Sequence, residues 1–447
     1  MMLLGTQRIN SNGHLEIGGC DTVELAREFG TPLYVVDEEA LRLACRTYRA
    51  AFEARYPRNQ IHYAGKAFLC TAMARIVEGE GLGLDVASAG ELYTALRAGF
   101  PPARINVHGN NKSVEELELA TANHVGHITV DHLGEIGMLA DVLRRHPRRR
   151  QDVLVRCAPG VDPETHKFIR TGQADTKFGL NISDGSALHA VAEVLRQPQL
   201  RFCGIHFHVG SQLTDADSHT GAIEAAAELM ATISSELGAS CEVLNIGGGL
   251  GVRYVEGGPV LSMGDFAETV VAALKACVAR YGLSEPILAQ EPGRSIIGEA
   301  GTTLYTIGAV KTVPIETSPG QRTYAAVDGG LSDNPRPQLY DARYEAICAS
   351  RAAEPHDHCI TIAGKHCETD VLIWDAKCAM LRTGDILAVQ TTGAYNYAMA
   401  SNYNRFTKPA VVLVGDGQAD LIVRRETLRD VVRCDLIPER LSRTMKG

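Results

Sequence analysis

One lysine stands where covalent chemistry is expected. Lys66 lies in the motif Tyr63-Ala64-Gly65-Lys66-Ala67, directly after a short apolar run with the composition of a β-strand. A lysine at the end of a strand that faces a cavity is partly desolvated, which lowers the pKa of its ammonium group and favours attack on a carbonyl. We therefore expect Lys66 to form an imine. A solvated loop lysine is the alternative that this motif alone leaves open.

A glycine-rich segment at 245–251, Asn-Ile-Gly-Gly-Gly-Leu-Gly, also follows an apolar run. Glycines let the backbone approach a ligand closely, and successive N–H groups in such a turn can bind a phosphate. The spacing differs from the GxGxxG pattern of dinucleotide-binding folds. We expect a phosphate site of another kind, with an ordinary tight turn as the alternative.

Two histidines, His206 and His208, fall on one face of a predicted strand. Such a pair can bind a metal, but no matching set of Asp, Glu or Cys ligands stands out in the sequence. We therefore expect no metal. A histidine stacked on a flat cofactor ring, with Ser211 near the phosphate of that cofactor, fits the other motifs better.

A carboxylate and a guanidinium are held in fixed relation in Glu291-Pro292-Gly293-Arg294. In a pyridoxal 5'-phosphate site the carboxylate keeps the pyridine nitrogen protonated, and the arginine binds a phosphate or a substrate carboxylate. Together with Lys66 and the glycine-rich segment, this motif indicates that cofactor.

The residues named above follow a repeated pattern of elements. From about residue 61 to 295, short apolar runs alternate with longer stretches of helical spacing, which indicates βα units. The eight runs are 61–64, 82–87, 104–108, 127–131, 153–157, 202–207, 243–246 and 287–290. Polar or special residues follow each run, as at the catalytic end of a closed barrel. The sequence therefore predicts an α/β protein with an eight-stranded β/α (TIM) barrel.

After residue 300 the pattern changes to strands without long helices, which predicts a mostly antiparallel β domain. The expected strands are 304–313, 324–327, 359–362, 371–374, 386–390, 410–414 and 419–423, and the strand-like run 33–36 is expected to join them. We expect the cofactor-binding barrel at 37–300. Residues 1–36 and 301–447 are expected to form a β-sandwich-like domain that completes the active site.

Composition excludes several classes of protein. The 447 residues are 45% hydrophobic and 22% charged, with a net charge of −9 and one short basic run at 144–150. We expect neither a nucleic-acid partner nor a membrane partner, because no long basic block and no membrane-spanning apolar run occurs. The twelve cysteines show no CxxC pair. A cytoplasmic protein with mostly reduced cysteines is expected.

Several motifs recur in the order found in one family. They are YAGKA at 63–67, HFHVGSQ at 206–212, NIGGGLG at 245–251, EPGRS at 291–295, SDNPRPQLY at 332–340, HCETD at 366–370 and GAYNYAMASNYN at 393–404. On these motifs the chain resembles the diaminopimelate decarboxylase family. That family belongs to the alanine-racemase-like, pyridoxal-phosphate-dependent (group IV) decarboxylases. The resemblance covers nearly the whole chain.

The resemblance implies roles for particular residues. Lys66 carries the cofactor, His208 stacks on its ring and Glu291 pairs with the pyridine nitrogen. The other implied cofactor contacts are Ser211, Gly248, Gly249, Gly293, Arg294 and Tyr395. The resemblance also implies a homodimer with shared active sites, in which Cys367 of the partner acts as the general acid. A thiol suits that role because it is mostly protonated at neutral pH. A buried structural cysteine is the alternative.

The resemblance also implies a substrate. Family positions that bind the distal carboxylate are matched by Arg294, Arg336 and Tyr340. Glu368 matches the contact to the distal ammonium, and Tyr395 matches a further substrate-binding position. The distal carboxylate and the distal ammonium of a diaminodicarboxylate thus each have a residue of opposite charge. The resemblance therefore implies decarboxylation of meso-2,6-diaminopimelate to L-lysine and carbon dioxide in lysine biosynthesis. Alternatives are a related decarboxylase or racemase for another amino acid, a noncatalytic homologue, and an aldolase-type barrel without this cofactor.

One departure from the family pattern lies beside the expected acid. The family reads Cys-Glu-Ser-Gly-Asp, whereas this chain reads Cys367-Glu368-Thr369-Asp370, which is one residue shorter. The deletion predicts either a tightened turn after Glu368 or a changed substrate, such as an aminoacyl group tethered to a carrier protein in secondary metabolism.

Overall fold

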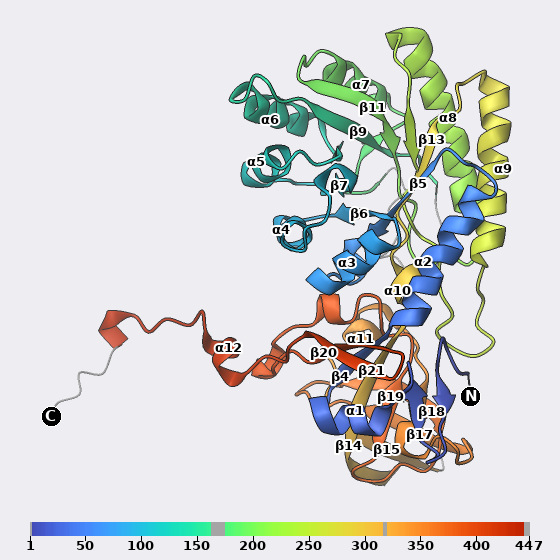
Figure 1. The fold of residues 1–447 in the computed structure, drawn as a ribbon, viewed down its shortest axis with the longest axis vertical. Helices are drawn as coiled ribbons and strands as arrows, with labels where there is room; N and C mark the ends of the chain where they lie inside the picture. Colours follow the sequence, from blue (N-terminus) through green and yellow to red (C-terminus); the bar gives the residue numbers. More distant parts are fainter. Residues whose placement is uncertain (1, 162–174, 316–319, 442–447) are drawn as a thin grey trace. The chain divides into compact units, whose positions relative to one another are not determined.

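The computed structural model describes residues 2–161, 175–315 and 320–441 (Figure 1). The chain divides into two units. The barrel unit comprises Met1–Gln7, Val36–Thr302 and Gln390–Ala398, and the sheet unit comprises Arg8–Val35, Thr303–Val389 and Met399–Gly447.

Eight parallel strands form the centre of the barrel unit. They are β5 (Asn59–Ala64), β6 (Gly83–Val86), β7 (Ile105–Val107), β8 (His127–Val130), β9 (Gln151–Ala158), β11 (Leu200–His206), β12 (Val243–Asn245) and β13 (Ile287–Gln290). Each strand pairs in parallel with the next, and β13 pairs with β5, which closes the barrel. The prediction of a closed eight-stranded barrel is confirmed, with all eight strands at the expected places.

Helices accompany the barrel strands: the first precedes β5, the last follows β13, and the others lie between successive strands (Figure 1). They are α2 (Glu38–Glu53), α3 (Thr71–Gly79), α4 (Ala89–Arg97), α5 (Val114–Ala122), α6 (Leu133–Arg144), α7 (Ser186–Leu195), α8 (Asp217–Leu237), α9 (Met263–Tyr281) and α10 (Arg294–Ile297), with η1 (Gly65–Ala67), η2 (Pro102–Arg104) and the short strand β10 (Leu180–Asn181). Local sequence fixes their starts. At α5, for example, Ser113 accepts from the Glu116 N–H and Glu116 accepts from the Ser113 N–H, a capping box.

A mixed sheet forms the sheet unit, in the order β18-β17-β15-β14-β4-β20-β21. These strands are β18 (Val371–Cys378), β17 (His358–Ala363), β15 (Gln321–Val327), β14 (Gly301–Pro314), β4 (Leu33–Asp37), β20 (Ala410–Gly415) and β21 (Gln418–Val423), and β19 (Ile386–Val389) pairs with both β14 and β16 (Ala346–Cys348). Five of the pairings are antiparallel, and the pairing of β15 with β17 is parallel. The expectation of a mostly antiparallel domain is confirmed, and the N-terminal strand β4 pairs within this sheet.

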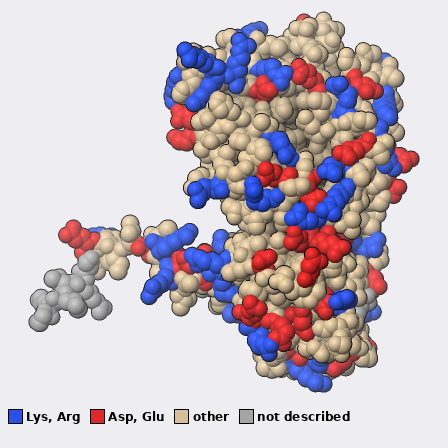
Figure 2. All heavy atoms as spheres, in the orientation of Figure 1, with Lys and Arg blue, Asp and Glu red and all other residues tan. Residues whose placement is uncertain are grey.

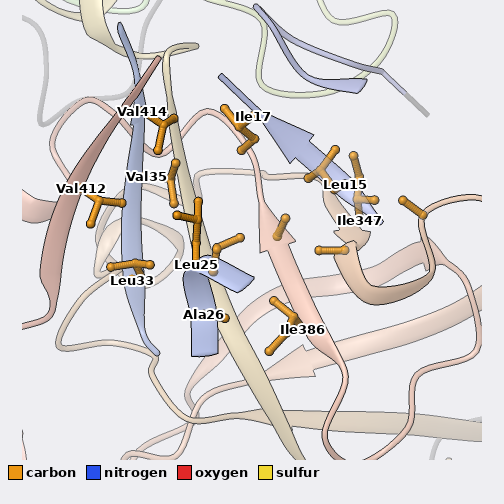
Figure 3. Close-up of a cluster of buried hydrophobic side chains, with 14 of the residues drawn as sticks. Leu15, Ile17, Leu25, Ala26, Leu33, Val35, Ile347, Ile386, Val412 and Val414 are labelled. Atoms are coloured by element: carbon orange, nitrogen blue, oxygen red, sulfur yellow. The ribbon is translucent and has the colours of Figure 1, made fainter. Parts of the chain in front are cut away.

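Shorter elements complete the sheet unit. They are β1 (Arg8–Ile9), β2 (Leu15–Ile17), β3 (Cys20–Asp21), α1 (Thr22–Phe29), α11 (Arg336–Tyr340), α12 (Leu428–Val432), η3 (Ala349–Arg351), η4 (Tyr397–Met399), η5 (Tyr403–Arg405) and η6 (Glu439–Leu441). The core of this unit joins side chains from both ends of the chain, such as Leu15 and Val35 with Val412 (Figure 3). Apolar burial therefore explains why the N-terminal segment belongs to this unit.

Charged side chains of both signs are interspersed on the face drawn in Figure 2. Among the described residues, no helix combines the length and apolar character that a membrane crossing needs. All twelve cysteines are free thiols.

Candidate active site

Lys66 lies in η1, immediately beyond the C-terminal end of β5. Its side chain is exposed to solvent, whereas the neighbouring Gly65 and Ala67 are buried. Two backbone hydrogen bonds hold the loop, from Ala64 N–H to the Pro292 carbonyl at 3.0 Å and from Tyr395 N–H to the Ala67 carbonyl at 2.8 Å. The amine is thus presented at the end of the barrel on a fixed backbone.

The expected direction of the Lys66 pKa is wrong. Desolvation by the surrounding protein would by itself lower this pKa, but the electrostatic influence of Tyr395, Asp85 and Glu291 outweighs desolvation and raises it. The sequence-based expectation counted desolvation and missed the acidic neighbours, which come from other strands. Without bound cofactor, the Lys66 side chain is therefore stabilised as an ammonium group.

Glu291 directly follows β13 and is buried. Its Oε1 accepts a hydrogen bond from Asn245 Nδ2 at 2.7 Å and lies 2.9 Å from His108 Nε2. Its Oε2 lies 3.1 Å from His206 Nε2. The partners belong to β12, to the segment after β7 and to β11, so barrel closure brings them to the carboxylate.

The charge state of this cluster follows from burial and the neighbouring charges. Burial opposes ionisation of Glu291, but electrostatic attraction to His108, together with hydrogen bonds from His108 and His206, outweighs it and holds the pKa of the carboxyl well below its usual range. Burial lowers the pKa of His206 to about 4. Burial alone would also lower the pKa of His108, yet Asp85 and Glu291 raise it. Glu291 is therefore held as an anion that favours the protonated form of His108, whereas His206 is kept neutral.

His206 and His208 have different surroundings. His206, His108 and Glu291 each place one potential ligand atom within 4.8 Å of the others. The sequence argument that no ligand set stands out near His206 thus missed Glu291, which lies 85 positions away. These side chains already pair with one another, which accounts for their geometry without an ion. His208 instead accepts a hydrogen bond from the Gly248 N–H at 3.3 Å.

The glycine-rich segment forms a tight turn against Glu291. A Cβ atom at Gly248 would lie 2.1 Å from the Glu291 carbonyl oxygen, so this approach requires glycine. The Gly247 N–H donates to Asn245 Oδ1 at 2.9 Å, and the Gly248 N–H donates to His208. Within the described residues, the N–H groups of Gly247 and Gly248 thus have protein acceptors, and that of Gly249 does not. The expected run of phosphate-binding N–H groups is therefore smaller than the sequence predicts.

Arg294, Ser211 and Tyr395 come together beside this turn. The Arg294 guanidinium donates to Ser211 Oγ at 3.1 Å and to the Tyr254 hydroxyl, and lies 4.7 Å from the centre of the Tyr395 ring. Tyr395 has a φ of 62°, a left-handed conformation that is uncommon for non-glycine residues and clusters at functional sites. A Cβ at Gly293 would lie 3.1 Å from the Ala64 and Ala67 Cβ atoms, so glycine lets this turn approach the Lys66 loop.

Further polar residues at the barrel end were noted in the sequence only as following strands. Burial raises the pKa of Asp85 to about 6, and its Oδ1 lies 3.6 Å from His108 Nε2. Arg156 lies 3.4 Å from Asp131 and stacks on the Phe178 ring at 4.4 Å. Asp85, Asp131 and Arg156 could have been recognised in the sequence, because each is a charged residue inside or just after an apolar run. Tyr254 lies outside every predicted strand and gave no such signal.

The remaining expected site residues belong to the sheet unit. Arg336 is buried in α11, and its guanidinium lies 5.0 Å from the centre of the Tyr340 ring. Gln338 of the same helix donates to the Val371 carbonyl at 2.8 Å, which fixes α11 beside the segment that carries Cys367.

Cys367 and Glu368 are both exposed, so the alternative of a buried structural cysteine is wrong. The Asp370 N–H donates to the Glu368 carbonyl at 2.8 Å, a three-residue turn. Asp370 itself is buried, with its carboxylate 2.6 Å from His366 Nδ1 and 3.0 Å from the Leu331 N–H. A tight turn therefore follows Glu368 in this chain.

Comparison with known proteins agrees with this geometry. The family described as pyridoxal-dependent decarboxylase, pyridoxal binding domain, matches residues 41–298. The chain is 47% identical to the diaminopimelate decarboxylase of Bacillus subtilis (strain 168), over 98% of each chain. The chain belongs to the diaminopimelate decarboxylase family.

Solved structures of this family have the same fold. A diaminopimelate decarboxylase from M. jannaschii, in complex with L-lysine, matches with a TM-score of 0.91 and 31% identity over 99% of this chain and 100% of that one. The enzyme from Helicobacter pylori, also complexed with L-lysine, matches with a TM-score of 0.83 and 28% identity over 92% and 98%. The chain is accordingly a carboxy-lyase whose cofactor is pyridoxal 5'-phosphate.

The barrel-end residues fit that cofactor chemically. Lys66 supplies an accessible primary amine, and Glu291 supplies a carboxylate that remains ionised. Within the described residues, Nε of Arg294 and Nδ1 of His206 are buried without a hydrogen-bond partner. Such atoms are usually paired in proteins, so a bound polar group is expected here.

Proposed function

We propose that the protein decarboxylates meso-2,6-diaminopimelate to L-lysine and carbon dioxide. The observation that carries this proposal is the similarity to curated diaminopimelate decarboxylases, which extends over 98% of both chains. The substrate is therefore the one named for those relatives.

The barrel unit is proposed to hold and tune the cofactor. Bound pyridoxal 5'-phosphate supplies an electron sink for the electron pair released when carbon dioxide departs. Lys66 attaches the cofactor through its amine, and His208 stacks on the ring. Glu291, kept ionised by His108, holds a proton on the pyridine nitrogen. Ser211, Arg294 and the Gly248–Gly249 turn hold the phosphate, together with Gly293 and Tyr395.

The sheet unit is proposed to complete the active site. Cys367 donates the proton that replaces carbon dioxide on the substrate carbon, for which an accessible thiol is suited. Arg336, Tyr340 and Arg294 bind the distal carboxylate, Tyr395 contacts the substrate, and Glu368 binds the distal ammonium. A diamine-forming enzyme has no use for paired arginines, because its substrate has a purely cationic tail.

The test is carbon dioxide release by purified protein loaded with pyridoxal 5'-phosphate. meso-Diaminopimelate is the substrate, and L-ornithine, L-arginine and L-lysine are the comparisons. Turnover confined to diaminopimelate is expected. Visible absorbance of lysine-bound cofactor without turnover would contradict the substrate and favour a carrier-tethered or other aminoacyl group.

We further propose a cytoplasmic homodimer in which Cys367 of one subunit serves the Lys66 of its partner. The twelve free thiols support a reducing compartment. Each of Lys66→Ala and Cys367→Ala removes activity alone. Mixed and reassembled, they form dimers with one intact site, and about one quarter of the activity returns for random pairing. No recovery, with mixed dimers present by mass, would contradict the shared site.

A further inference from the structure

Two adjacent residues contact the expected acid loop from outside it. The Tyr403 hydroxyl donates to Glu368 Oε1 at 2.6 Å, and Asn404 Oδ1 accepts from the Cys367 N–H at 3.2 Å. Both belong to η5, at the end of the GAYNYAMASNYN motif, and the proposed function gives neither a role. We call Tyr403 and Asn404 the clamp pair.

The clamp pair is itself held in place. The Tyr403 ring stacks on the His366 ring with centroids 5.8 Å apart and an interplanar angle of 14°. His366 is buried and fixed by Asp370. Asn402 Nδ2 donates to Glu426 Oε2 at 2.6 Å, which anchors the segment before the pair. The Tyr403 hydroxyl therefore reaches Glu368 from a ring with little freedom to move.

We propose that Tyr403 is a specificity-determining positioning residue, which aims the Glu368 carboxylate at the distal ammonium of the substrate. This inference rests on the proposed function. An exposed glutamate samples many rotamers, and binding an ammonium group must overcome that lost freedom. A hydrogen bond formed in advance reduces this cost. The same hydrogen bond raises the pKa of Tyr403, so the hydroxyl keeps its proton and remains a donor.

The shortened loop makes outside support necessary. Within the loop, the turn from Glu368 to Asp370 fixes backbone atoms only. Glu368 is exposed, and its carboxylate accepts a hydrogen bond from Tyr403, which lies outside the loop. Asn404 acts on the neighbouring residue, because it holds the backbone of Cys367. The two members of the clamp pair are therefore expected to affect different kinetic constants.

Tyr403→Phe removes the hydroxyl and keeps the ring on His366. It is expected to raise KM for meso-diaminopimelate about tenfold with little change in kcat, as for loss of a hydrogen bond to a charged group. Asn404→Gly removes the acceptor and tolerates the φ of 51° found there. It is expected to lower kcat and change KM little. Tyr93→Phe, on the exposed face of α4, is the matched control and should change neither.

The decisive comparison uses ligands that differ at the distal end. L-Lysine keeps the distal ammonium and carboxylate, and calorimetry with cofactor-loaded protein should give about tenfold weaker binding to Tyr403→Phe. 2-Aminopimelate lacks the distal ammonium and should bind both proteins equally as a competitive inhibitor. Unchanged thermal unfolding midpoints would confirm that the fold is intact.

The outcomes separate this inference from the proposed function. An unchanged KM and L-lysine affinity in Tyr403→Phe, or an equal loss of affinity for 2-aminopimelate, would overturn the positioning role. Absence of diaminopimelate turnover in the unmodified protein would overturn the proposed function instead. The L-lysine titration tests Tyr403 in either case.

Discussion

The barrel end and the acid loop at 366–370 show two ways to prepare a reactive group. Glu291 is only 6% exposed and has three polar partners from different strands. Cys367 and Glu368 are exposed, and each is contacted by one member of the clamp pair. The barrel end is thus prearranged within one chain, whereas the acid loop presents its groups outward.

This difference matches what each region is proposed to bind. A cofactor that stays bound can be held by a buried charged network, because its charges are compensated once and permanently. Groups that meet a substrate in every cycle must remain accessible. Substitutions at the barrel end should therefore affect cofactor binding and tuning, and substitutions in the acid loop should affect substrate binding and turnover but leave cofactor binding unchanged.

Lys66→Ala should have the largest effect. Loss of the attachment amine is expected to reduce turnover by at least about 10⁴-fold, as for removal of a nucleophile. The visible absorbance of lysine-bound cofactor should also disappear. Lys275→Ala, on the exposed surface of α9, is the control and should retain both properties. Turnover and absorbance that persist in Lys66→Ala would assign the attachment to another lysine.

Cys367→Ala should separate the two regions. Loss of the general acid is expected to lower kcat about 10³-fold, while the absorbance of the bound cofactor stays unchanged. Cys359→Ala removes another exposed thiol, on β17, and should be fully active. If Cys367→Ala lost cofactor as well, the acid loop would share the role of the barrel end and the comparison would fail.

Glu291→Gln keeps the size of the side chain and an acceptor for Asn245 but removes the charge. We expect kcat to fall about 10²-fold, because an amide does not hold a proton on the pyridine nitrogen. One of the two charges that raise the pKa of His108 is also lost, so this pKa should fall. Nuclear magnetic resonance of His108 can measure that fall. An unchanged kcat would assign control of the ring nitrogen to another residue.

The sequence predicts the strands better than it predicts the contacts between side chains at the strand ends. Apolar runs placed all eight barrel strands, and the motif at 291–294 identified Glu291 because turn residues surround it. The contact of His108 with Glu291 was not foreseen, since it exists only after closure joins distant strands. The raised pKa of Lys66 was missed for the same reason. Tyr403 lies in the family motif at 393–404, but its contact with Glu368 was not foreseen, because the two residues are 35 positions apart.

The smallest expected effect concerns His219, which supports the glycine-rich turn. This fully buried histidine of α8 lies with Nε2 3.1 Å from the Gly248 carbonyl oxygen, and burial lowers its pKa to about 4. In an unfolded chain, histidine titrates near pH 6.5. Between these values the unfolded state binds a proton that the folded state does not, so stability falls as the pH falls.

His219→Gln should therefore reduce the acid sensitivity of the fold. From pH 7 to pH 5, this histidine is expected to cost the unmodified protein about 2 kcal/mol, a loss that a neutral glutamine does not share. Urea unfolding at the two pH values measures the difference. Equal losses in both proteins would mean that His219 takes up its proton inside the fold. The turn beside Glu291 would then be less protected from water than the barrel-end geometry implies. The barrel end and the exposed acid loop would then differ less in solvent exposure.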